Sequence, residues 1–165
     1  MIKSIPIPTA GVSLGLAALG NLLQPYSPLM KYTCGILAAI LLAMLLIKIL
    51  RYPKLVHADM TGNPILGSVA ATFFMTTMQL CVYIKDFAPF LCEAIWLAAV
   101  AAHAILIIWF SKNFMLNLEL KNVFPTFFIA YVGIVVASVT APAFGYFTLG
   151  YYLSLIHISE PTRLR

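Results

Sequence analysis

The chain of 165 residues is 62% hydrophobic and only 9% charged. Soluble globular domains carry about 25% charged residues, so this composition excludes that class and predicts an integral membrane protein. The formal net charge of +5 comes from Lys and Arg residues that are scattered between apolar segments, and this pattern predicts no binding of nucleic acid.

Five apolar segments approach the roughly 20 residues that a helix needs to cross a bilayer. In chain order they are residues 5–23, 32–50, 65–84, 88–110 and 125–145, and the start of a sixth follows at residues 147–152. We therefore expect an all-α, multi-pass membrane protein.

The connections between these segments differ in charge. Residues 24–31 and 85–87 are short, whereas residues 51–64 and 111–124 are longer and basic. Six cations belong to the amino terminus and to the long connections with the helix ends beside them: Lys3, Lys48, Arg51, Lys54, Lys112 and Lys121. Only Lys31 and Lys85 lie on the other side. Because basic connections stay in the cytoplasm, we expect a cytoplasmic amino terminus and solvated basic loops.

The first segment differs from a simple membrane anchor in its many helix-weakening residues, which are Pro6, Pro8, Gly11, Gly15 and Gly20. Gly11 and Gly15 stand one turn apart and predict close packing against another helix. Thr9 and Ser13 form a second, polar stripe at the same spacing. We interpret residues 5–23 as a helix that lines an internal feature of the protein, with Thr9 and Ser13 as pore-lining candidates and a kink at Pro8.

The other odd-numbered segments also carry hydroxyls and helix breakers. Ser68, Thr72 and Thr76 follow one another at four-residue steps in residues 65–84. Residues 125–145 hold a small-residue stripe and a proline, and their candidate residues are Gly133, Ser138, Thr140 and Pro142. Such hydroxyls either line a pore or satisfy backbone carbonyls between helices. The even-numbered segments are bulky and apolar, as expected of helices that face lipid.

Two ionisable residues lie within the fourth segment. Glu93 is close to the membrane edge, so an interfacial position is favoured over a buried functional role. His103 is in mid-segment, where a packing hydrogen bond is favoured over proton transfer because no second ionisable residue lies at a matching depth.

No sequence pattern indicates an enzyme, a metal site or a cofactor. The cysteines are Cys34, Cys81 and Cys92, and their spacing matches neither a zinc site nor a redox pair, so we assign them to packing. A metalloprotease-like HExxH pattern is also lacking.

The first segment resembles the opening helix of the tellurite-resistance/C4-dicarboxylate transporter family, which includes the plant guard-cell slow anion channels. The residues that match its PxPTxGxxxGLAAL pattern are Pro6, Pro8, Thr9, Gly15, Leu16, Ala17, Ala18 and Leu19. A looser similarity covers the fifth segment and the Gly-Tyr turn after it. The resemblance covers residues 1–152 in layout.

The resemblance implies ten helices in five hairpins, with the odd-numbered helices around a central pore and the even-numbered ones outside. It implies transport of small anions, such as C4-dicarboxylates including malate, tellurite or inorganic anions, across the plasma membrane. It also implies a homotrimer. This chain would supply the amino-terminal half of the ring. A proton-coupled secondary carrier and a non-transporting membrane protein are the alternatives.

The last residues do not fit this picture. Residues 153–163 read as the translation of a sequencing-library adapter, so we expect residues 153–165 to be a non-native tail and residue 152 to end the natural sequence. His157, Ser159 and Glu160 are therefore not assigned to any site.

Overall fold

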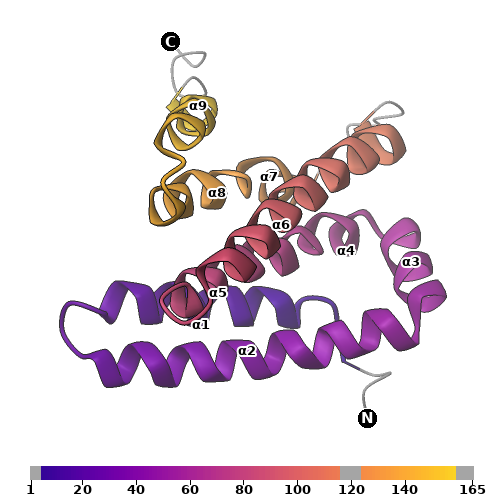
Figure 1. Ribbon diagram of the computed structural model, residues 1–165. Coiled ribbons are helices and arrows are strands. Elements are labelled where there is room, and N and C mark those ends of the chain that lie inside the picture. Colours follow the sequence, from indigo (N-terminus) through magenta and orange to yellow (C-terminus); the bar gives the residue numbers. More distant parts are fainter. Residues whose placement is uncertain (1–4, 116–123, 159–165) are drawn as a thin grey trace.

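The computed structural model describes residues 5–115 and 124–158, and helices and turns make up this part of the chain without any β-strand (Figure 1). The all-α expectation is therefore confirmed. Four helical stretches are long and apolar enough to cross a membrane, and a shorter apolar helix, α1 (Thr9–Leu23), precedes them.

The four long stretches follow one another along the chain. The first is α2 (Pro28–Arg51), and the second combines α4 (Pro64–Val69) with α5 (Ala71–Ile84). The third is α6 (Pro89–Phe110), which continues as the π-helical turn η2 (Ser111–Met115). The fourth comprises α7 (Phe127–Val132), α8 (Val135–Thr140) and the 3-10 turn η4 (Ala141–Phe144). Helix α9 (Phe147–Ile158) follows a turn at Gly145, whose φ of 81° suits glycine.

Prolines begin four of the nine α-helices in the described part of the chain. Pro28, Pro53, Pro64 and Pro89 all occupy the first turn, where a missing N–H costs nothing. The Asn63 side chain caps α4 by accepting a hydrogen bond from the Ile65 amide at 2.9 Å.

Helix α1 is shorter than the sequence predicts. It begins at Thr9 rather than at residue 5, because the two prolines before it form a turn in which the Thr9 amide donates to the Pro6 carbonyl at 3.1 Å. Its 15 residues extend for about 22 Å, which is less than the roughly 30 Å of a hydrocarbon core.

The first basic connection is not an irregular loop. Residues 53–62 form helix α3 (Pro53–Gly62), which lies at the bend between α2 and α4 (Figure 1). Val56 and Met60 are one turn apart on it and pack against a buried apolar cluster. The expectation of a solvated loop is therefore wrong for the face that carries Val56 and Met60. The charged residues of this segment drew attention away from the helical spacing of these two apolar residues.

The packing order of the helices places α5 at the centre of the described part of the chain. Helix α1 packs against α2 and α5, and α5 in turn packs against α6, α7 and α8. The core is divided between two clusters of buried side chains, one around Phe110 and Phe127 and the other around Trp96 and Met78. Helix α2 exposes a long row of apolar side chains, as a lipid-facing helix does: Ile36, Leu37, Ile40, Met44 and Ile47.

Candidate functional site

Hydroxyl groups fasten α1 to both of its neighbours. Ser13 is fully buried and donates to the carbonyl of Ala38 on α2 at 2.7 Å. Thr76 on α5 lies 3.3 Å from the Ala10 carbonyl of α1 and 2.7 Å from the Thr72 carbonyl of its own helix. Two of the predicted pore-lining residues, Ser13 and Thr76, therefore lie at helix contacts.

A tyrosine of α5 strengthens the same contact near the other end of α1. The Tyr83 hydroxyl donates to the Ala17 carbonyl at 2.6 Å. The ring fits into grooves left by two glycines: a Cβ on Gly20 would overlap the Tyr83 hydroxyl, and one on Gly35 would lie 2.6 Å from its Cε1 atom. Sequence reasoning noted Gly20 only as a helix breaker and missed Gly35.

The remaining hydroxyls of the α4–α5 stripe bond within their own chain segment. Ser68 donates to the Ile65 carbonyl at 2.9 Å and Thr72 to the Val69 carbonyl at 2.7 Å, and both residues are buried. A hydroxyl that is bonded in this way presents less polarity to a neighbouring helix or to a pore.

The opposite face of α1 is open. Cβ atoms added at Gly11 or Gly15 would find no atom within 4 Å in the described part of the chain. Thr9 is half-buried on this helix, and Val12 and Leu19 are exposed. Close packing at Gly11 and Gly15 would thus need atoms other than those described here.

The fifth predicted span is interrupted at Gly133, between α7 and α8. A Cβ there would lie 2.5 Å from the Ile129 carbonyl and 2.7 Å from the sulfur of Met75, so only glycine fits without displacement. His103 of α6 lies against this break, with its Nε2 atom 3.0 Å from the Ala130 carbonyl. The expected packing hydrogen bond of His103 is thus present, and Nε2–H donates it because a carbonyl oxygen can only accept.

The end of this span is joined to α6 by a second set of contacts. The buried Trp96 indole donates to Thr140 Oγ1 at 2.8 Å, and Tyr146 stacks on the Trp96 ring with centroids 5.8 Å apart. Tyr146 donates to Glu93 Oε1 at 2.5 Å, and this bond to the carboxylate raises the pKa of Tyr146 above its ordinary value. Nearby, Ser138 donates to the Gly150 carbonyl at 2.7 Å, while Pro142 in η4 is exposed.

A comparison with protein families identifies what this helical arrangement belongs to. The family model described as voltage-dependent anion channel (SLAC1) matches residues 4–156, which is nearly the whole chain. The chain belongs to the voltage-dependent anion channel family. It is thus a multi-pass membrane protein that transports anions, and the resemblance noted in its first helix is confirmed. A search of curated proteins found no match.

Members of the family are channels and transporters rather than enzymes. No group of three or more His, Cys, Asp or Glu side chains that could hold a metal ion occurs in the described part of this channel.

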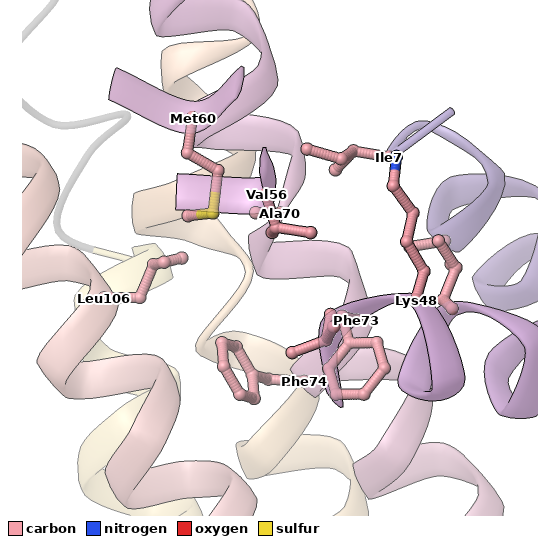
Figure 2. A pocket seen from close by; sticks show the side chains of 11 residues that line it. Ile7, Lys48, Val56, Met60, Ala70, Phe73, Phe74 and Leu106 are labelled. Carbon is pink, nitrogen blue, oxygen red and sulfur yellow. The ribbon is translucent and has the colours of Figure 1, made fainter. Parts of the chain in front are cut away.

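The channel contains an apolar crevice at the end where α2 turns into α3. It has a volume of about 170 Å³ and lies between several helices (Figure 2). Leu45 and Ile49 of α2 and Leu106 of α6 form its walls, and residues of α3 cover it. Ala10 of α1 and Phe73 of α5 also line it.

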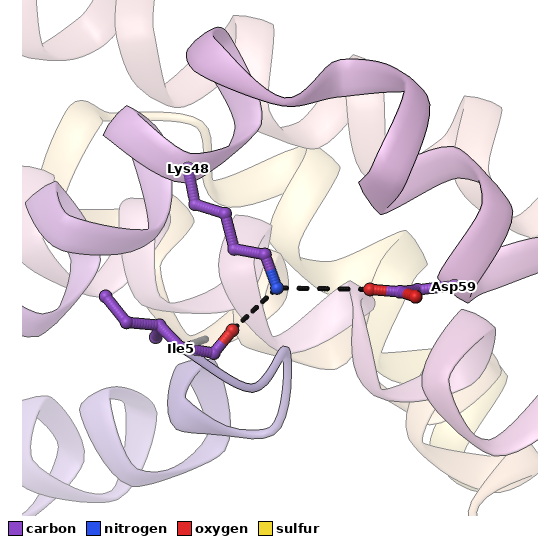
Figure 3. A network of polar contacts seen from close by, with 3 residues as sticks. All are labelled: Ile5, Lys48 and Asp59. Atoms are coloured by element: carbon purple, nitrogen blue, oxygen red, sulfur yellow. Dashed lines mark hydrogen bonds and ion pairs between the residues drawn. The ribbon is translucent and has the colours of Figure 1, made fainter. Parts of the chain in front are cut away.

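Lys48 beside this crevice is the functional candidate that the sequence analysis missed. Its side chain is only 5% exposed, and its Nζ atom donates to the Ile5 carbonyl at 2.6 Å (Figure 3). The nearest carboxylate oxygen, Asp59 Oδ2, is 3.9 Å away and belongs to a side chain that is 37% exposed. Lys48 therefore links the residues that precede α1 to helix α3. In the sequence, Lys48 lies at the end of an apolar span, and it therefore counts only among the cations that indicate the orientation of the chain in the membrane.

Proposed function

We propose that small anions cross the membrane along a path bordered by α1, α4–α5 and α7–α8, which would form half of the ring around a central pore. The observation that carries this proposal is the composition of these helices, which we call the inner helices. These helices pack in sequence against one another, and none of them contains an Asp, Glu, Lys or Arg residue.

An uncharged path suits rapid passage of anions. A fixed cation would bind an anion strongly, whereas amide and hydroxyl dipoles bind it weakly enough to release it. Pro8 precedes the first helix rather than kinking it, and Gly133 and Pro142 interrupt the fifth span, where the carbonyls of both residues accept from the amide three residues on. Irregular backbone of this kind is tolerated in a membrane where it lines a cavity.

The predicted pore residues divide into two roles in this proposal. Ser13, Thr76 and Thr140 hold the inner helices to their neighbours, so they set the width of the path. The open face of α1, with Thr9, Gly11 and Gly15, forms part of the surface of the path. Ser68, Thr72 and Ser138 lie on the same layer, with their hydroxyls bonded to carbonyls.

The finer expectations belong to the same proposal. The chain would be the amino-terminal half of a plasma-membrane channel with its amino terminus in the cytoplasm, and three copies would assemble. The transported ion would be a C4-dicarboxylate, tellurite or an inorganic anion. A proton-coupled carrier has less support, because ten residues, or about 15 Å of helix, separate Glu93 from His103 along α6.

The test is anion efflux from liposomes that contain the channel, with chloride, nitrate, malate and tellurite supplied in parallel. The proposal predicts electrogenic flux that follows the anion gradient and that persists in Glu93→Gln and His103→Asn variants. Empty liposomes provide the control. Flux that requires a proton gradient and disappears in these variants would instead establish a coupled carrier, and absence of flux for every anion would contradict transport.

A further inference from the structure

We propose that the crevice beside Lys48 binds one acyl chain of an anionic phospholipid, and that the exposed cations Arg51 and Lys54 hold its headgroup. The site would be distinct from the anion path. It depends on insertion of the protein in a membrane and is independent of which anion is transported.

The position of the crevice suits an acyl chain. Lys48 of α2 and Leu106 of α6, two helices that we expect to face lipid, line it from opposite sides of the view, and Phe73 and Phe74 of α5 lie between them (Figure 2). Its lining surface is entirely apolar, although Lys48 contributes to it. The reason is that the Nζ atom of Lys48 is turned to the Ile5 carbonyl, which leaves the aliphatic stem toward the crevice. A hydrocarbon chain gains free energy there, and a polar ligand would lose its hydration without compensation.

The charges at the crevice complement an anionic headgroup. Arg51 ends α2 and Lys54 lies in the first turn of α3, so both fall between the lining residues Ile49 and Val56. Both side chains are exposed, and neither forms an ion pair within the part of the chain that the structure describes. Within the described residues, the carboxylate of this segment is that of Asp59, which lies 3.9 Å from the Lys48 Nζ atom. Clusters of this kind beside a membrane span attract anionic lipids.

A second apolar crevice provides an internal comparison. It has a volume of about 200 Å³ and lies near the opposite end of α2, where Gly35, Ala39 and Tyr83 line it. Lys31 beside it is already placed over the ring of Tyr83 at 5.3 Å, and the exposed charged residue of the nearest turn is the acidic Asp86. This second crevice has room for an acyl chain, but it lacks a pair of exposed cations like Arg51 and Lys54 to hold a headgroup.

Native mass spectrometry of the detergent-purified chain tests the proposal, with dioleoyl phosphatidylglycerol or dioleoyl phosphatidylcholine added. We expect selective retention of one phosphatidylglycerol. Replacing both cations, Arg51→Gln with Lys54→Gln, lowers this retention by about 30-fold, because each surface cation contributes a factor of about five. Equal retention of the two lipids by the wild-type chain, or unchanged retention after the double replacement, would overturn the proposal.

Variants that fill the crevice test the place of the acyl chain. Ala70→Leu adds volume to the crevice at the residue that precedes α5, and Leu106→Phe adds volume on α6. Each is expected to abolish phosphatidylglycerol retention. Ala39→Leu adds comparable volume in the second crevice and should leave retention unchanged. Circular dichroism verifies that each variant keeps its helix content, and two independent crevice variants protect the test against a folding defect in one. Retention that survives both would show that another surface binds the lipid, and the proposal would be wrong.

Discussion

The substitution Gly20→Ala should destabilise the channel, although alanine is the better helix former. Its Cβ would overlap the Tyr83 hydroxyl and lie 2.9 Å from the Cβ of Cys34 and 3.0 Å from the Lys31 carbonyl. Overpacking of this kind costs about 1–3 kcal/mol. Displacing Tyr83 from the Ala17 carbonyl costs about 1 kcal/mol more. The gain in helix propensity offsets about 1 kcal/mol, so a net loss of about 2 kcal/mol is expected.

Gly15→Ala is the matched control, because Gly15 lies on the same helix with no atom near its Cβ position in the described chain. This variant should be neutral or gain up to about 1 kcal/mol from helix propensity. Reversible unfolding in SDS-containing micelles, followed by circular dichroism, measures both. Equal stability of Gly20→Ala and wild type would refute the packing argument, and a large loss in Gly15→Ala would reveal a close neighbour on the face that we describe as open.

Three further substitutions test other contacts. Thr140→Val should cost about 1–3 kcal/mol in the same unfolding assay, because it leaves the buried Trp96 indole N–H without an acceptor, whereas Thr140→Ser should retain the bond. The raised pKa of Tyr146 stabilises the fold below the ordinary tyrosine pKa of about 10, so stability should fall as the pH rises above 10 in the wild type but less in Tyr146→Phe, which a pH series of thermal melts measures. Lys48→Met should accelerate hydrogen exchange at the start of α1, while Asp59→Asn should change it little because the ion pair is long and partly exposed; equal acceleration in both would contradict this assignment.

The sequence predicted the helical class and the membrane spans because both follow from runs of apolar residues. It also noted the hydroxyl residues of α4–α5, and α5 packs against α1, α2, α6, α7 and α8, as a helix that contacts protein on several sides needs small and hydroxyl residues. The predicted start of α1 is four residues too early, because Ile5 and Ile7 extend the apolar run although Pro6 and Pro8 delay the first helical bond.

Contacts between distant segments were beyond prediction from one sequence. The groove formed by Gly20 and Gly35 for Tyr83 depends on the register of three helices, which no local pattern encodes. The burial of Lys48 was missed for a similar reason. A lysine near the end of a span normally reaches the interface, and only the fold of α3 over the crevice keeps this one covered.

Cysteine accessibility on α1 tests the central claim most directly, namely that the open face of this helix borders the anion path. Gly15→Cys and Ala17→Cys are introduced into a channel whose Cys34, Cys81 and Cys92 have been replaced by alanine, and anion flux is followed during treatment with a charged, membrane-impermeant thiol reagent. The account predicts rapid modification and loss of flux for Gly15→Cys, and no change for Ala17→Cys, because Ala17 is buried. Flux through Gly15→Cys that is unaffected by the reagent would contradict the account.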